Sequence, residues 1–280
     1  MEAFEVKKVL NNNVLIASNS KYEEVVLIGK GIGFNRKKGS TISKQEAEKL
    51  FVLKGETEQE QYKKLLPFID DETLEVIISA IDLIRKRTAK YLDEHIHVAL
   101  TDHILFAINR LMKGLAIKNP FNEETQVLYP TEYEVANEVV DLINEMTNIE
   151  LPIGEVGFIA LHIHSAVTSK NLSEINQNSQ LIAQLVHTIE EQFEIKLNKN
   201  EINYMRLVRH LRYTIERVLS GEKVNEPEKI SFFLKQEYPL CYNLAWKLIK
   251  IMQQTLKKPV FEAEAVYLTM HLQRIQNKIK

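Results

Sequence analysis

The sequence has little cysteine, no long hydrophobic run and almost no net charge. Its one cysteine, Cys241, excludes an internal disulfide and suits a reducing compartment. No apolar run reaches the ~18–20 residues that a membrane-spanning helix needs, and the N-terminus lacks the apolar stretch of a secretory signal. A net charge of −2 shows no overall preference for nucleic acid. We therefore expect a cytoplasmic protein without membrane insertion.

The sequence also lacks the usual signatures of enzymes and metal sites. It has no Cys/His spacing of a structural zinc site, no P-loop, and no Ser/His/Asp or Cys/His signature. His95 with His97, and His162 with His164, look like zinc ligands of a hydrolase. However, residues i and i+2 of a helix point to nearly opposite sides, and neither pair belongs to an H-E-x-x-H motif. We predict no metal, no other cofactor and no catalytic residues.

Charge and glycine are distributed unevenly along the chain. Residues 1–55 contain ten Lys and Arg against six Glu, which gives +4, whereas residues 56–280 contain 26 basic and 32 acidic residues, which gives −6. Five of the nine glycines lie in the first segment, and all seven prolines lie at Pro67 or later. This shift in composition predicts a first domain over residues 1–58.

Short apolar runs separated by turn residues predict that the first domain is a small antiparallel sheet. Asn11–Asn13 separates the first two runs, and asparagine tolerates the backbone of tight turns. The predicted strands of this four- or five-stranded sheet include residues 4–10, 14–17, 22–28 and 49–53. A sheet of this size buries little core alone, so we expect a partner, most simply a second copy.

The glycine-rich segment Gly29–Gly33 allows two interpretations. It is not a dinucleotide fingerprint, because it reads G-x-G-x-G and leads into the basic residues 36–38 rather than into a helix. Glycines beside Phe34 and lysines suit close approach to a polyanion, with an aromatic ring available for stacking on a base. The alternative is an ordinary glycine turn with Phe34 in the core.

The rest of the chain shows helical periodicity and an internal repeat. Residues 100–111 return 107 residues later as 207–218, and a second register of 109 residues aligns 158–163 with 267–272. We therefore predict two homologous all-helical domains, over residues 62–170 and 171–280, joined by the polar stretch 168–179.

Each copy of the repeat keeps two histidines, and an arginine follows the first of them by seven residues. Arg110 and Arg217 thus share a helix face with the first histidine of their copy, and arginine suits binding of phosphate or carboxylate. Histidine can act as a nucleophile and a proton carrier near neutral pH. The retained histidines are His103, His162, His210 and His271. An inert helical scaffold with buried histidines remains the alternative.

Residues 7–14 with residues 29–34 resemble a co-antiterminator (CAT) RNA-binding domain, and the histidine-bearing repeats resemble two PTS regulation domains (PRDs). This order is that of the BglG/SacY family of transcriptional antiterminators. Three segments, residues 11–18, 94–97 and 237–242, resemble the GlcT-type branch of this family, which regulates glucose phosphotransferase (PTS) operons.

For the sheet domain, the resemblance implies a homodimer that binds an RNA hairpin in a nascent leader transcript. Holding that hairpin prevents an overlapping terminator from forming. The residues that match the family's RNA-contacting positions are Lys8, Asn13, Gly29, Lys30 and Phe34.

For the helical domains, the resemblance implies that all four repeated histidines accept phosphoryl groups. From their spacing, we expect Arg110 and Arg217 to support these phosphate sites. The donors would be the enzyme II of the glucose permease and the phosphocarrier HPr. We hypothesise that phosphorylation of the first helical domain disfavours the RNA-binding dimer. A DNA-binding regulator of similar architecture is the alternative, although residues 1–55 show no helix-turn-helix pattern.

Overall fold

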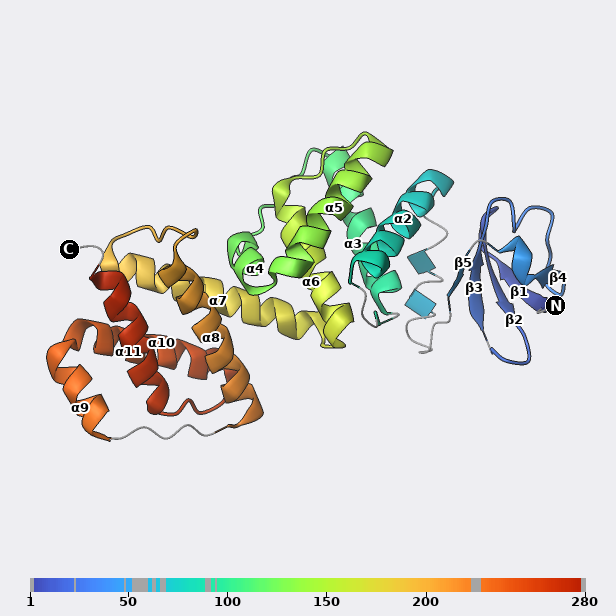
Figure 1. Cartoon of the computed structure of the whole chain (residues 1–280). Coiled ribbons are helices and arrows are strands. Elements are labelled where there is room, and N and C mark those ends of the chain that lie inside the picture. Colours follow the sequence, from blue (N-terminus) through green and yellow to red (C-terminus); the bar gives the residue numbers. More distant parts are fainter. Residues whose placement is uncertain are drawn as a thin grey trace. The chain divides into compact units, whose positions relative to one another are not determined.

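A small sheet is followed by ten helices in the described part of this computed structural model (Figure 1). The described residues are 3–22, 24–47, 49–51, 60–61, 64–65, 69–88, 92–93, 95–222 and 228–277. The chain divides into two compact units, one of residues 1–117 with 134–170 and one of residues 118–133 with 171–280. The predicted fold class, an antiparallel all-β domain followed by all-α repeats, is confirmed.

The sheet has five antiparallel strands in the order β4-β1-β2-β3-β5. The strands are β1 (Ala3–Val9), β2 (Val14–Ser18), β3 (Val25–Ile28), β4 (Thr41–Ser43) and β5 (Lys49–Phe51). The short helix η1 (Lys44–Glu46) follows β4 and begins with a capping box between Ser43 and Glu46. The hairpin predicted around Asn11–Asn13 joins β1 and β2.

One apolar cluster fills the core of the sheet domain. In β1, Phe4 and Val6 are buried and their neighbours are more exposed, as the two-residue period of a strand requires. The buried residues of this cluster are Phe4, Val6, Leu15, Ala17, Val25, Leu27, Ile32 and Ile42.

The first set of helices contains two long helices that pack together, α3 and α6. The helices are α2 (Asp71–Thr88), α3 (His95–Met112), α4 (Asn122–Leu128), α5 (Pro130–Thr147) and α6 (Ile153–Thr168). The second set repeats the pattern, with α8 packed against α11. Its helices are α7 (Leu172–Phe193), α8 (Ile202–Ser220), α9 (Glu228–Glu237), α10 (Pro239–Leu256) and α11 (Ala263–Gln276).

The prediction of a polar linker over residues 168–179 was wrong. Helix α6 ends at Thr168 and α7 begins at Leu172, so most of this stretch is the first two turns of α7. The side chain of Asn171 caps α7 by accepting a hydrogen bond from the Ser173 N–H (2.8 Å). Ile175 is buried within the stretch, so its polar residues are the exposed face of an amphipathic helix.

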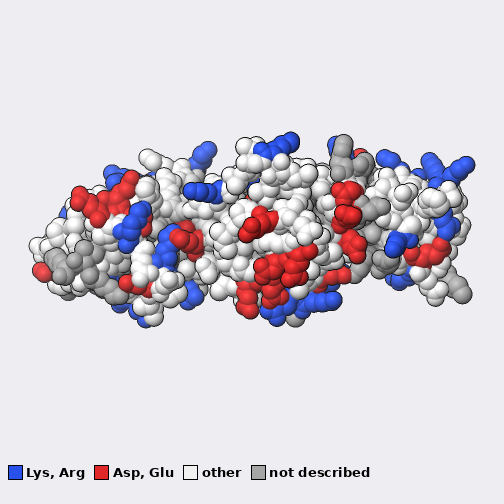
Figure 2. Space-filling model, turned by 90° about the horizontal axis from the view of Figure 1, so that it is seen from above, with Lys and Arg blue, Asp and Glu red and all other residues white. Residues whose placement is uncertain are grey.

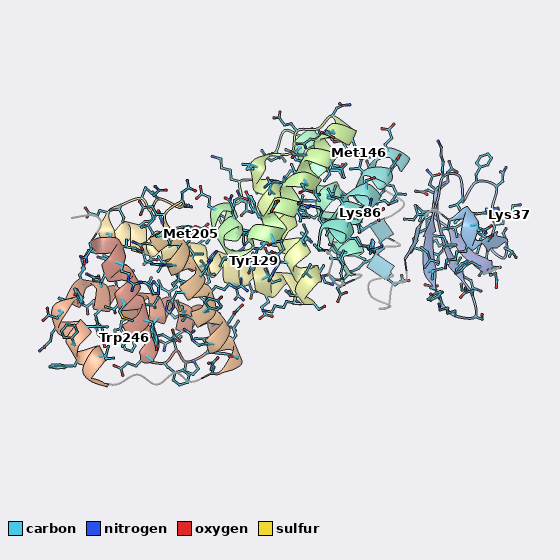
Figure 3. The ribbon with its side chains drawn as sticks, viewed as in Figure 1. Lys37, Lys86, Tyr129, Met146, Met205 and Trp246 are labelled. Atoms are coloured by element: carbon cyan, nitrogen blue, oxygen red, sulfur yellow. The ribbon has the colours of Figure 1, made fainter. Side chains whose placement is uncertain are left out.

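The internal repeat extends to single hydrogen bonds. The Asn122 side chain donates to the Tyr133 hydroxyl (2.9 Å), and 109 residues later Ser231 and Tyr242 are joined in the same way (3.1 Å). Tyr129, labelled in Figure 3, lies under the guanidinium of Arg212 at 5.2 Å. The two matching hydrogen bonds show that α4–α5 and α9–α10 are equivalent parts of the repeat, although α4 itself lies within the second compact unit.

Candidate functional site

Two turns are tied together at one end of the sheet. The side-chain oxygen of Asn13 accepts the N–H of Gly31 (2.6 Å), and its main-chain oxygen accepts the N–H of Gly29 (3.0 Å). The N–H of Gly33 donates to the Asn12 oxygen (2.8 Å). The residues predicted to form one site, Asn13 and the glycine loop, are therefore in direct contact. Because the Oδ1 atom of Asn13 accepts the hydrogen bond from Gly31, the Asn13 NH₂ group is the part of this side chain that can donate to a ligand.

The glycine loop presents an aromatic ring and a lysine to solvent. Phe34 is 64% exposed, so the alternative that places it in the core is wrong, and Ile32 occupies the core instead. A Cβ atom on Gly33 would lie 2.2 Å from the Asn11 oxygen, so this close approach requires glycine. Lys30 is exposed, and Lys8 is exposed in β1 opposite Ile16. Figure 2 shows further Lys and Arg side chains over the sheet domain, at the right of the view.

In the first helical unit, the two repeated histidines lie side by side. The rings of His103 on α3 and His162 on α6 have centroids 4.9 Å apart, and the ring of Phe158 is 5.8 Å from His103. The Nε2 atom of His103 is 3.0 Å from Oε2 of Glu155. The other carboxylate oxygen of Glu155 accepts a hydrogen bond from Arg110.

Burial determines the charge state of this first cluster. The Glu155 side chain is fully buried, so its carboxylate needs the counter-charge that Arg110 provides. Burial, reinforced by the neighbouring His103 and His95, lowers the pKa of His162 to about 3. His162 is therefore a neutral imidazole near pH 7, which is the form that carries a nucleophilic lone pair.

The second helical unit contains the same cluster. The rings of His210 on α8 and His271 on α11 stack with centroids 4.6 Å apart, and the Tyr267 ring lies 6.0 Å from His210. Arg217 donates to both oxygens of Glu264, at 2.8 Å each.

The charge state of the second cluster is likewise set by burial. Burial, together with His271 and Arg217, outweighs the opposing effect of Glu264 and lowers the pKa of His210 to about 4. Burial, with Arg274 and Arg206, also lowers the pKa of His271. The four histidines singled out by the repeat thus form two close pairs in matching surroundings.

Comparison with known proteins identifies the chain's relatives. The CAT RNA binding domain matches residues 4–60, and the PRD domain matches residues 79–166 and 183–275. The chain is 61% identical over 277 residues to the PtsGHI operon antiterminator of Bacillus subtilis (strain 168), covering 99% of each chain. It is 42% identical to the GlcA/glcB genes antiterminator of Staphylococcus carnosus (strain TM300), over 97% of this chain and 96% of that protein. The crystal structure of GlcT CAT-PRDI has a TM-score of 0.55 and 57% identity, and covers 60% of this chain and 99% of that chain.

The chain belongs to the family of antiterminators that join a CAT domain to PRD domains. The protein acts by RNA-binding antitermination under the control of PTS phosphorylation. The glycine loop lies within the CAT match, and each histidine pair lies within one PRD match. The family therefore favours RNA over the DNA-binding alternative.

Sequence reasoning missed the role of two glutamates in these PRD domains. The 109-residue register aligns Glu155 with Glu264, but nothing in the sequence placed them beside the histidines. The available signal was an ionisable residue repeated inside an apolar helix, since buried charges are nearly always paired. Arg110 and Arg217, predicted as phosphate-site support, both bind these carboxylates.

A third histidine of the first PRD domain has contacts like those of a catalytic triad. The Nδ1 atom of His95 is 3.0 Å from Asp93 Oδ1, and its Nε2 atom is 3.2 Å from Ser165 Oγ. However, Ser165 is buried and donates its own hydroxyl hydrogen to the Lys170 main-chain oxygen (2.6 Å). Its oxygen therefore accepts a hydrogen bond from His95 and is not activated as a nucleophile. The contacts among Asp93, His95 and Ser165 instead connect the start of α3 to the end of α6.

Burial alone would raise the pKa of Asp93, but its hydrogen bonds with His95 outweigh this and lower it. Within the described residues, no three His, Cys, Asp or Glu side chains are placed to hold a metal ion together. None of the helices in the described part of the chain is long and apolar enough to cross a membrane.

Proposed function

We propose that the chain acts in the cytoplasm as a homodimeric, sugar-responsive antiterminator of a glucose PTS operon. The dimer binds an RNA hairpin in the leader transcript and prevents the terminator from forming. The relatives named as antiterminators of the PtsGHI operon and of the GlcA/glcB genes support this assignment. The protein acts by binding and by being phosphorylated, without catalytic turnover of its own.

The RNA-contacting residues of this proposal are Lys8, Asn13, Gly29, Lys30 and Phe34. The exposed ring of Phe34 suits stacking on an unpaired base, and the NH₂ group of Asn13 suits a base edge. Lys8 and Lys30 add positive charge for phosphates. Because lysine lacks the planar fork of arginine, Lys30 acts as a point charge rather than as a bidentate donor.

The four paired histidines, His103, His162, His210 and His271, accept phosphoryl groups in this proposal. The observation that carries it is the duplication itself: two imidazole pairs, each with a buried glutamate and an arginine, recur in both PRD domains. Arg110 and Arg217 support phosphorylation by neutralising the glutamate beside each pair, which would otherwise repel the incoming phosphoryl group.

Enzyme II of the glucose permease acts on the first PRD domain in this scheme, and HPr acts on the second. A phosphoryl group adds a charge of roughly −1.5 to −2 if phosphohistidine behaves like other phosphorylated residues. Without sugar, this charge on the first PRD domain disfavours the RNA-binding dimer. With sugar, the permease passes its phosphoryl groups to the sugar and the dimer forms.

The regulatory half is tested with an antitermination reporter in cells grown with and without sugar. His103→Ala and His162→Ala, singly and together, are expected to make antitermination insensitive to sugar. His187→Ala is the control, because His187 has no counterpart in the repeat and lies exposed beside Glu191. An unchanged sugar response in all three histidine variants of the first PRD domain would contradict the proposal.

The RNA-binding half is tested by gel shift of the full chain on the leader hairpin at several salt concentrations. Binding is expected to weaken steeply as salt rises, because phosphate contacts release counterions. Phe34→Ala is expected to weaken binding, whereas Phe232→Ala, which alters an equally exposed ring (64% and 63%) in the second PRD domain, is not. Equal effects of the two substitutions would refute the assigned surface.

A further inference from the structure

The two histidine clusters differ at one position of the helix face that they share. Four residues after the first histidine, α3 has Ala107 and α8 has Thr214, and both residues are buried. The Thr214 hydroxyl donates to Oε2 of Glu264 (2.9 Å) and lies 3.5 Å from Nε2 of His210. The methyl group of Ala107 can do neither.

This difference changes what the buried glutamate contacts. In the first PRD domain, Arg110 contacts one oxygen of Glu155 and His103 contacts the other. In the second, Arg217 contacts both oxygens of Glu264, and Thr214 donates to one of them. His210 therefore faces a hydroxyl group where His103 faces a carboxylate.

A carboxylate beside one ring nitrogen decides which tautomer a neutral imidazole adopts. Since a carboxylate only accepts hydrogen bonds, the Nε2 atom of His103 must carry the proton that Glu155 accepts. The lone pair then lies on Nδ1. The Thr214 hydroxyl gives its hydrogen to Glu264, so its oxygen can only accept from Nε2 of His210. It favours the same tautomer more weakly, because the oxygen is uncharged and lies 3.5 Å from Nε2.

We propose that Glu155 is a positioning residue that directs phosphoryl transfer to Nδ1 of His103, and that the uncharged Thr214 oxygen gives His210 only a weaker form of this support. The residue four places after the first histidine, Ala107 or Thr214, thereby determines how the two PRD domains differ as phosphoryl acceptors. This inference rests on the proposed phosphorylation of the histidines and specifies its chemistry.

The transfer step is balanced without any further reactant. The Nδ1 lone pair of His103 attacks the phosphorus of an N-phosphorylated donor, and the new N–P bond forms as the donor's P–N bond breaks. The electron pair of that bond returns to the donor nitrogen. The proton stays on Nε2, so the imidazole ring gains positive charge, which the buried Glu155 carboxylate stabilises.

The first experiment measures the tautomers by ¹⁵N NMR of the histidine rings in the unphosphorylated full chain. Wild-type His103 is expected to be protonated on Nε2. Ala107→Ser adds a hydroxyl with little volume. By replacing the carboxylate contact with a longer contact to an uncharged oxygen, it is expected to lower the Nε2-protonated fraction of His103, and Ala107→Thr tests the full exchange. In the second PRD domain, Thr214→Val removes this weaker acceptor at similar volume and is expected to lower the Nε2-protonated fraction of His210.

The second experiment uses phosphoramidate as the donor and follows each phosphohistidine by ³¹P NMR. Phosphate is expected on Nδ1 of His103, and Glu155→Gln is expected to slow its formation by about tenfold, a modest value for the loss of a carboxylate partner of a reactive histidine. His271, in the other PRD domain, serves as the internal control whose rate should not change.

The outcomes separate this inference from the proposed function. An Nδ1-protonated His103 in the wild type, phosphate on its Nε2 atom, or an unchanged rate in Glu155→Gln would overturn the positioning role, although His103 would still be an acceptor. A failure of phosphorylated HPr and enzyme II to modify any of the four histidines would instead contradict the proposed function. The tautomer measurement would still decide the role of Glu155.

Discussion

Replacing Arg110 by methionine tests whether the buried carboxylate of the first PRD domain depends on its counter-charge. The Glu155 side chain is 0% exposed and that of Arg110 is 8% exposed, so neither charge is well solvated. Removing one partner of a buried pair typically costs ~3–5 kcal/mol, because the other charge remains buried. His103 stays beside Glu155 and offsets part of this loss, so we expect about 3 kcal/mol.

The matched control is Arg87→Met, in the same helical unit. Arg87 contacts Glu138 at 2.7 Å, but the two side chains are 45% and 37% exposed. Solvent-exposed pairs contribute ~0–1 kcal/mol, so this substitution is expected to cost less than about 1 kcal/mol. The same change of side chain is therefore predicted to have very different effects at two positions that differ mainly in burial.

Because the chain has two compact units, a single free energy of unfolding does not describe it. The suitable assay is native-state hydrogen exchange of the full chain in low urea, read separately for each helix. Arg110→Met is expected to lower the opening free energy of α3 and α6 and to leave α8 and α11 unchanged. A second variant, Arg110→Met with Glu155→Met, is expected to recover most of the loss, since it removes both charges. If Arg110→Met costs less than about 1 kcal/mol, the reasoning from buried charge is refuted.

Three further predictions follow from single residues. Burial lowers the pKa of His162 from 6.5 to about 3, so on acidification the unfolded chain binds this proton before the folded chain does. The free energy of unfolding should therefore be constant with respect to this group above pH 6.5 and fall between pH 6.5 and pH 3. In urea titrations at several pH values, His162→Gln should make that fall less steep. An unchanged slope would contradict this. Phe34→Ala should weaken hairpin binding by roughly 5–150-fold, from ~1–3 kcal/mol per stacked base, without changing the melting temperature; a lowered melting temperature would show that the ring supports the fold. Gly33→Ala should destabilise the sheet domain by ~1–3 kcal/mol in thermal melts, because its Cβ would clash with the main-chain oxygen of Asn11. Ile32→Val, which removes one buried methylene from the same loop without a clash, is the control and should cost ~0.5–1.5 kcal/mol. A smaller loss in Gly33→Ala than in Ile32→Val would refute the steric argument.

The fold class could be predicted because its determinants are local. Alternating apolar residues and asparagine turns predicted β1 to β3, and helical periodicity with the 107- and 109-residue registers predicted two helical repeats. Strand β4 has three residues, too few to show an alternation. The polar stretch 168–179 was interpreted as a linker because polarity alone does not distinguish a loop from the exposed face of a helix such as α7.

The site could be predicted only as far as the repeat reaches. The repeat selected the four histidines, and its 109-residue register aligned Glu155 with Glu264, but it could not place either glutamate in a cluster. Glu155 lies 52 residues from His103, and Glu264 lies 47 residues from Arg217. The contact between His95 and Ser165 could not be predicted either, because these residues lie 70 positions apart in the sequence. Contacts of this separation depend on how α3 meets α6 and α8 meets α11, which no spacing within one helix reveals.

The two PRD domains share their buried charged and aromatic contacts and differ in small or exposed side chains. Each retains a pair of imidazole rings in contact and a buried glutamate with an arginine, and removing one partner of such an ion pair is strongly destabilising. Among their differences are the hydroxyl group at Ala107 and Thr214, and the exposed charge beside the first histidine, Asp102 in α3 and Arg209 in α8. The hydroxyl changes the contacts of the ring, and the exposed charge changes the field that an anionic donor protein meets on approach. A duplicated scaffold with these two differences can present the same imidazole chemistry to two donors and still respond to them unequally.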